Sequence, residues 1–189
     1  MIPLAFINYG GIQAIQTLWA GPWMLNISGY TPLQSATGLF WINITMLISY
    51  FIWGYILPKI SDYGINSIKL IKLGLPISYF SLFLIIYFGN NAGAFLFTIY
   101  IMTSIVISLT QPAIALNFSK NLAGKSLTSF NVFLFSGTFF VQWGIGLIID
   151  LCNNKGFDIL SSYRISFSLF LFLCVLSYVF FIYLNKNEN

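Results

Sequence analysis

Seven amide side chains lie within the most apolar segments of this sequence: Asn8, Gln13, Gln16, Asn43, Gln111, Asn131 and Gln142. An amide in hydrocarbon needs a hydrogen-bond partner, either on a neighbouring helix or in a water-filled cavity. Gln13 and Gln16 are three residues apart, and Asn131, Thr138 and Gln142 recur at helical spacing, so each set shares one side of a helix. Amides arranged in this way bind uncharged polar groups of a ligand without taking up or releasing protons.

We predict that six of these amides, together with Trp19 one turn beyond Gln16, line a cavity for a small solute. The predicted cavity residues are Gln13, Gln16, Trp19, Asn43, Gln111, Asn131 and Gln142. The alternative is that each amide bonds to a neighbouring helix and only holds the helices together. Packing at the membrane interface is the simpler interpretation for the other tryptophans, Trp23 and Trp143.

Catalytic side chains are scarce in the apolar segments. The chain has no histidine, and no Asp, Glu, Lys or Arg lies in the middle of an apolar segment. We therefore predict a protein that is not an enzyme, with no catalytic residue, no metal site and no cofactor. Asp150 and Asp158 lie at or beyond the predicted membrane surface, which makes them poor candidates for a buried proton relay. The net charge of +4 comes from scattered basic residues and does not indicate nucleic-acid binding.

The elements that must position the amides are membrane-spanning helices. Hydrophobic residues make up 58% of the 189 residues and charged residues only 6%, too few to cover a water-soluble globule. The apolar runs do not alternate as barrel strands do, and in hydrocarbon a helix satisfies its own backbone. We predict an all-α integral membrane protein, a single bundle over 1–189 with six spans near 4–25, 36–57, 67–88, 92–116, 127–150 and 164–184.

The basic residues predict the orientation of these spans. Six of them, Lys59, Lys69, Lys72, Lys120, Lys125 and Lys186, lie around the second and fourth gaps or after the last span. Only Lys155 and Arg164 lie in the fifth gap, on the opposite side. The positive-inside rule therefore places both termini in the cytoplasm, and an even number of spans agrees with termini on the same side.

The amides also predict an internal repeat. They lie in the first, second, fourth and fifth spans, and the third and sixth spans have none. Two amide-bearing helices followed by a plain helix therefore occur twice, as a 3+3 inverted repeat. Each half of the repeat contains a helix break in its first span, Gly21-Pro22 near the outer end of one and Pro112 near the inner end of the other.

Several segments resemble the C-terminal six-helix half of bacterial members of the major facilitator superfamily (MFS) of transporters. Residues 18–23 (Leu-Trp-Ala-Gly-Pro-Trp) resemble the end of their seventh helix. Residues 121–125 (Asn-Leu-Ala-Gly-Lys), 142–146 (Gln-Trp-Gly-Ile-Gly) and 149–151 (Ile-Asp-Leu) resemble their eleventh helix and the loop before it, and Tyr163-Arg164 resembles the start of their twelfth. The resemblance implies secondary transport of a small solute across a bacterial cytoplasmic membrane by alternating access.

The cytoplasmic gate of that family is only partly present. Members often carry a glycine, an acidic and a basic residue and a turn glycine between the second and third helices of a half. Here the corresponding residues are Gly54, Lys59, Asp62 and Gly64, with Pro58 where the acid is expected. Lys59 keeps the basic position, and the acidic residue Asp62 lies four residues after the position where the family has its acid.

The resemblance covers one half of a twelve-helix protein and therefore implies an N-terminal six-helix half. We expect the chain to be a fragment of a longer protein that contains this half. The alternatives are a half-transporter that pairs with a partner chain or with itself, a non-transporting membrane scaffold or assembly subunit, and a passive pore formed by oligomers. A scaffold uses the same amides to hold helices together and moves no solute.

Overall fold

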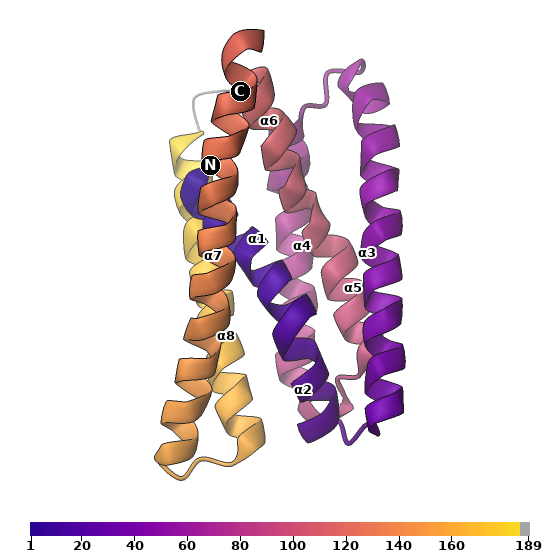
Figure 1. Cartoon of the computed structure of the whole chain (residues 1–189), viewed down its shortest axis with the longest axis vertical. Helices are drawn as coiled ribbons and strands as arrows, with labels where there is room; N and C mark the ends of the chain where they lie inside the picture. Colours follow the sequence, from indigo (N-terminus) through magenta and orange to yellow (C-terminus); the bar gives the residue numbers. More distant parts are fainter. Residues whose placement is uncertain (186–189) are drawn as a thin grey trace.

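The computed structural model describes residues 1–185, and this part of the chain is almost entirely helical, with no strand. Its long elements run side by side as a bundle, and the N-terminus lies toward the same end of the bundle as the end of the last helix (Figure 1). The prediction of an all-α architecture is confirmed. Lys186 lies outside the described residues.

Five of the described helical segments are long and apolar enough to cross a membrane. They are Pro32–Ser61, Ser67–Asn91, Ala94–Leu116, Asn121–Asn154 and Ile159–Leu184. The remaining predicted span is continuous helix from Ile2 to Asn26, but a wide turn divides it into α1 (Ile2–Ala14), η1 (Ile15–Trp19) and α2 (Ala20–Asn26). The described fold is therefore that of a multi-pass membrane protein.

The later spans follow in chain order. They are α3 (Pro32–Ser61), α4 (Ser67–Phe88) with the short η2 (Gly89–Asn91), then α5 (Ala94–Ser104), η3 (Ile105–Leu109) and α6 (Thr110–Leu116) as one interrupted span, α7 (Lys120–Asn154) and α8 (Ile159–Leu184). Side chains fix several helix starts. Thr31 and Gln34 form a reciprocal capping box before α3, and Asn66 and Asp158 accept backbone N–H groups at the starts of α4 and α8.

Glycines allow α1 and α7 to pack backbone against backbone. A Cβ on Gly137 would lie 2.2 Å from the Phe6 carbonyl oxygen, and one on Gly10 would lie 2.5 Å from the Gly137 carbonyl carbon. Small residues at such crossings let membrane helices gain close van der Waals contact, the main attraction between helices in lipid. The remaining α1 surface contacts α8, and α4 packs against α5 and α8.

Hydrogen bonds join α4 to α8 near both ends of the two helices. Arg164, in the second turn of α8, donates to the carbonyl oxygens of Ile86 and Tyr87 at 2.9 Å each, at the C-terminal end of α4. These carbonyls lack a partner within the helix, and a cation there also favours the helix dipole. Toward the other end, the Tyr178 hydroxyl donates to the Lys72 carbonyl oxygen at 2.6 Å.

Candidate functional site

The predicted cavity residues are distributed over four of the six spans. Gln13 lies on α1, Gln16 and Trp19 lie on η1, Asn43 on α3, Gln111 on α6, and Asn131 and Gln142 on α7. Most of these side chains are half-buried, and Asn43 is exposed. The structure brings them together as three bonded groups.

The first group joins η1 to α3. The Gln16 side-chain amide donates to the Asn43 side-chain oxygen, and the Asn43 amide donates to the Leu39 carbonyl oxygen one turn back at 2.7 Å. An interhelical amide pair of this kind satisfies polar groups that lipid cannot solvate. Asn43 nevertheless stays exposed on the surface of the bundle.

The second group joins η1 to α7. Gln142 donates through its side-chain amide to the Thr17 hydroxyl at 2.8 Å, and Thr17 donates to the Gln13 carbonyl oxygen at 2.6 Å. The indole N–H of Trp19 donates to the backbone carbonyl oxygen of Gln142 at 3.2 Å. Trp19 and Gln142 therefore lie in contact with each other, and their assignment to a solute cavity stays a prediction.

The third group lies between α6 and α7, where Gln111 donates to the Asn131 side-chain oxygen at 3.4 Å. Tyr9 and Ile114 of α6 both pack against the buried cluster of Ala5, Phe130 and Leu134, and the Tyr9 hydroxyl accepts the Gln13 side-chain N–H at 3.3 Å. We call the three groups together with Tyr9 the polar face; its members are Tyr9, Gln13, Gln16, Thr17, Asn43, Gln111, Asn131 and Gln142.

Asn8 does not belong to the polar face, although it is an amide of the same span. It is only 4% exposed and lies between α1, α4 and α8. Its amide donates to the Ser177 hydroxyl at 3.1 Å and to the Leu4 carbonyl oxygen at 2.9 Å, while its side-chain oxygen accepts the Tyr79 hydroxyl at 2.9 Å. Asn8 thus bonds the two helices that have no amide of their own.

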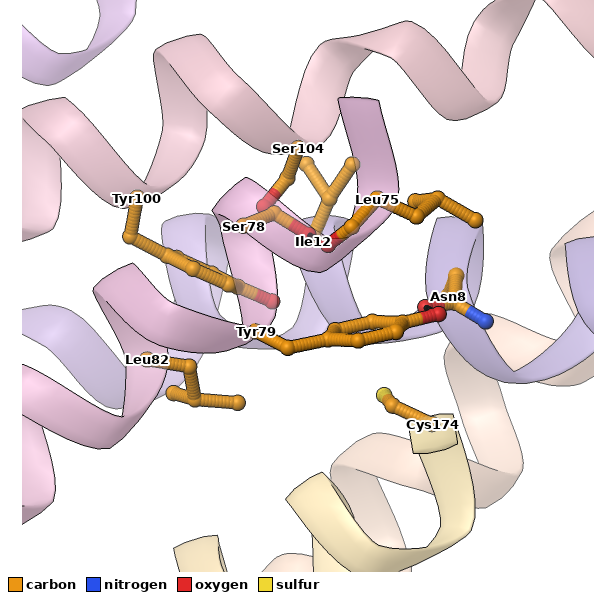
Figure 2. Close-up of a pocket in the computed structure, with 9 residues that line it drawn as sticks. All are labelled: Asn8, Ile12, Leu75, Ser78, Tyr79, Leu82, Tyr100, Ser104 and Cys174. Carbon is orange, nitrogen blue, oxygen red and sulfur yellow. Dashed lines mark hydrogen bonds between the residues drawn. The ribbon is translucent and has the colours of Figure 1, made fainter. Parts of the chain in front are cut away.

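Figure 2 shows this buried cluster, with the Tyr79 ring directed at Asn8 and with Tyr100, Ser104 and Cys174 around it. The cavity that they enclose is about 10 Å³, the volume of one water molecule at most. The sequence analysis did not predict that these residues form one cluster. Helix geometry does indicate that Asn8 faces away from the other amides of its span, because Asn8 and Gln13 are five residues apart and point about 140° away from each other.

Non-α turns precede both prolines that we predicted as helix breaks. The π-helical turn η1 (Ile15–Trp19) comes before Pro22, and the 3₁₀ turn η3 (Ile105–Leu109) comes before Pro112. Proline lacks the N–H that bonds the carbonyl four residues earlier, and its ring crowds that carbonyl. The carbonyls concerned belong to Leu18 and Ser108, inside the two turns. Gly21 itself is buried in regular helix, so the irregularity lies one turn deeper than the predicted break.

The predicted gate residues do not form one loop. Gly54 and Lys59 lie within α3, because this helix continues through Pro58 to Ser61. Asp62 and Gly64 lie in the turn that follows, where Gly64 has a positive φ of 77°. Lys59 contacts the hydroxyl and ring of Tyr55 one turn earlier instead of a carboxylate. The assignment of these four residues to a cytoplasmic gate stays a prediction.

The tryptophans divide into different environments. Trp23 is fully buried and packs its ring against Phe97, Tyr163 and Phe167, which is a packing role. Trp19 is half-buried, and Trp143 is 57% exposed. The last two line the same surface groove.

This groove lies between η1 and α7 and has a volume of about 380 Å³. Its lining includes Trp19, Phe139, Gln142, Trp143 and Asp150, and Gly146 forms part of its floor. A Cβ on Gly146 would lie 3.1 Å from the Trp19 ring, so the missing side chain lets this ring lie close to the α7 backbone. We call it the tryptophan groove.

Neither a family model nor a curated protein nor a solved structure matches this chain. Within residues 1–185, no group of three or more His, Cys, Asp or Glu side chains is placed to hold a metal ion.

Proposed function

We propose that this chain forms one six-helix half of a secondary transporter of the MFS type, which moves a small solute across the bacterial cytoplasmic membrane by alternating access. The observation that carries the proposal is the polar face, to which the first, second, fourth and fifth spans contribute and the third and sixth do not. Two of its bonds link α7 to η1 and η1 to α3, so the face crosses several helices. A second six-helix unit, on the same polypeptide or a partner chain, would close the path over this face.

The contacts between spans support the proposed 3+3 repeat. The first span packs against the fifth (α1 with α7) and the fourth against the second (α5 with α3). The third packs against the fourth (α4 with α5) and the sixth against the first (α8 with α1). Suppose that each span is replaced by its counterpart in the other triplet: the first by the fourth, the second by the fifth and the third by the sixth. Each of these four contacts then becomes another of the four. One pair departs from this exchange, because α7 packs closely on α8 and α3 touches α4 much less.

The two irregular turns supply a place for bending. Each lies just past the middle of its span, the first of its triplet, and in the proposed topology the two spans run in opposite directions. The turns therefore lie at different depths, as inverted repeats require. Helix breaks lined by polar residues are typical of sites where a membrane helix bends during transport.

The basic residues support the proposed orientation, with both termini in the cytoplasm. The Lys72 ammonium donates to the Asn185 carbonyl oxygen at 3.2 Å, which places this lysine beside the end of the described chain. Arg164 lies at the opposite end of α4. The proposed assignment follows the positive-inside rule.

A non-transporting scaffold or assembly subunit is the second candidate, and the amide pairs favour it. Gln16 already donates a hydrogen bond to Asn43, and Gln111 donates one to Asn131. In a scaffold these pairs serve only as interhelical bonds, and water never reaches them. Water access to the polar face therefore separates the two candidates.

Thiol labelling tests the proposal in native membranes, where any second half is present. Single cysteines replace Gln13, Asn131 or Gln142 in a chain whose Cys152 and Cys174 are serines. The controls replace Leu82, which is fully buried, and Phe172, which is 61% exposed on α8, the sixth span. We expect a polar maleimide to label the three test positions at least about tenfold faster than either control, because maleimides react with the thiolate, which needs water. Equal rates at test and control positions would reject the cavity and favour the scaffold.

A further inference from the structure

The tryptophan groove has the chemistry of a binding site for a hydrophobic organic cation. Its volume of about 380 Å³ is in the range of small-molecule sites. Three aromatic rings line it, those of Trp19, Phe139 and Trp143. Asp150 is the only charged residue among its lining residues.

One of the three rings, that of Trp19, is positioned by contacts that do not depend on a ligand. Trp19 is fixed by its indole N–H on the Gln142 carbonyl oxygen and by edge-to-face packing on Tyr163, with ring centroids 6.1 Å apart. Phe139 and Trp143 stand one turn apart on α7 and are 62% and 57% exposed. A binding cation would therefore meet one ring that is already ordered, that of Trp19, and two exposed rings beside it.

The negative charge and the aromatic rings of the groove favour a cationic ligand. Aromatic faces attract cations through the ring quadrupole, and indole does so most strongly. Asp150 lies exposed two turns along α7 from Trp143, where a carboxylate attracts the same charge. No lining residue offers a positive charge to an anion.

The groove is continuous with the polar face, because Gln142 belongs to both. We propose that the tryptophan groove binds small hydrophobic organic cations, which would make cations of this class the solutes that enter at this end of the path. The identification as a solute site rests on the proposed function, whereas binding itself does not.

Equilibrium binding of tetraphenylphosphonium tests the proposal directly. The full chain is placed in phosphatidylcholine nanodiscs, and protein-free nanodiscs measure partitioning into lipid. We expect saturable binding of tetraphenylphosphonium and none of tetraphenylborate, an anion of nearly the same shape. Asp150→Asn and Trp143→Leu are each expected to weaken binding about fivefold or more.

Asp158→Asn is the matched control. It removes the same charge from a nearby exposed position outside the groove, and asparagine caps α8 as well as aspartate does. Binding to this variant is expected to equal the wild type. The proposal is overturned if binding does not saturate above the protein-free level, if Asp150→Asn binds as tightly as Asp158→Asn, or if tetraphenylborate binds equally well.

Failure here is distinguishable from failure of the proposed function. Rapid labelling at Gln13 and Asn131 without cation binding would leave the transporter proposal intact and remove the cation class. Asp150-dependent binding with unlabelled amides would make the groove a binding site on a membrane protein that does not transport.

Discussion

The α1–α7 crossing predicts a large effect from a single methyl group. Gly137→Ala would place a Cβ 2.2 Å from the Phe6 carbonyl oxygen and 2.9 Å from the Phe6 carbonyl carbon, both backbone atoms. Ordinary contacts between such atoms are about 3.5 Å, so the two helices must separate by roughly 1 Å along this direction. Overpacking of this kind costs about 1–3 kcal/mol.

Gly144→Ala is the matched control on the same helix. A Cβ there has no atom within 4 Å, so only the higher helix propensity of alanine acts, for a gain of up to about 1 kcal/mol. The measured quantity is the free energy of unfolding in mixed micelles, followed by tryptophan fluorescence during titration with a denaturing detergent. The propensity gain is the same for both variants, so we expect Gly137→Ala to be about 1–3 kcal/mol less stable than Gly144→Ala. Equal stability of the two variants would refute the close backbone crossing.

Three further predictions follow from other contacts. Asn8→Leu leaves the Tyr79 hydroxyl and Ser177 without their shared partner, so it should cost about 1–2 kcal/mol in the same unfolding assay, against less than about 0.5 kcal/mol for the exposed Asn90→Leu. Pro22→Ala restores an N–H for the Leu18 carbonyl, so the π turn should revert toward α-helix, which carbonyl chemical shifts at 15–19 would report; unchanged shifts would show that proline is not its cause. Hydrogen bonds from Ser161 hold the pKa of Asp158 below its usual range, so the cap on α8 should persist at and above the ordinary carboxyl pKa and weaken as pH falls through the lowered value. Amide exchange at Ser161 measures this, and pH-independent protection would contradict it.

Hydropathy located the spans well but not the ends of the helices. The third span was predicted at 67–88 and is found there, because Asn66 caps its start and Gly89, with a φ of 53°, ends it. The fifth was predicted at 127–150 but runs from Lys120 to Asn154. Its first turns are polar, so hydropathy does not count them, although they are helical.

The sequence proposed the residues of the candidate site but not the hydrogen bonds between them. Sequence position indicated that Trp19 and Gln142 share a site, and the structure joins them directly. Gln16, which pairs with Asn43, lies in the π turn, a feature that the sequence analysis did not predict. A proline indicates that a helix is disturbed, but the packing of the neighbouring helices decides whether the turn becomes wider or tighter. Sequence alone carries no such information.

The two-sided accessibility of Gln13 tests the proposed alternating access most directly. Gln13 lies midway along the helical segment from Ile2 to Asn26, which in the proposed topology is far from either membrane surface. A cysteine at this position is exposed to a membrane-impermeant thiol reagent in sealed right-side-out vesicles and in inside-out vesicles. The account predicts labelling from both sides, each above the rate at Leu82. Labelling from one side only, or from neither, would contradict it.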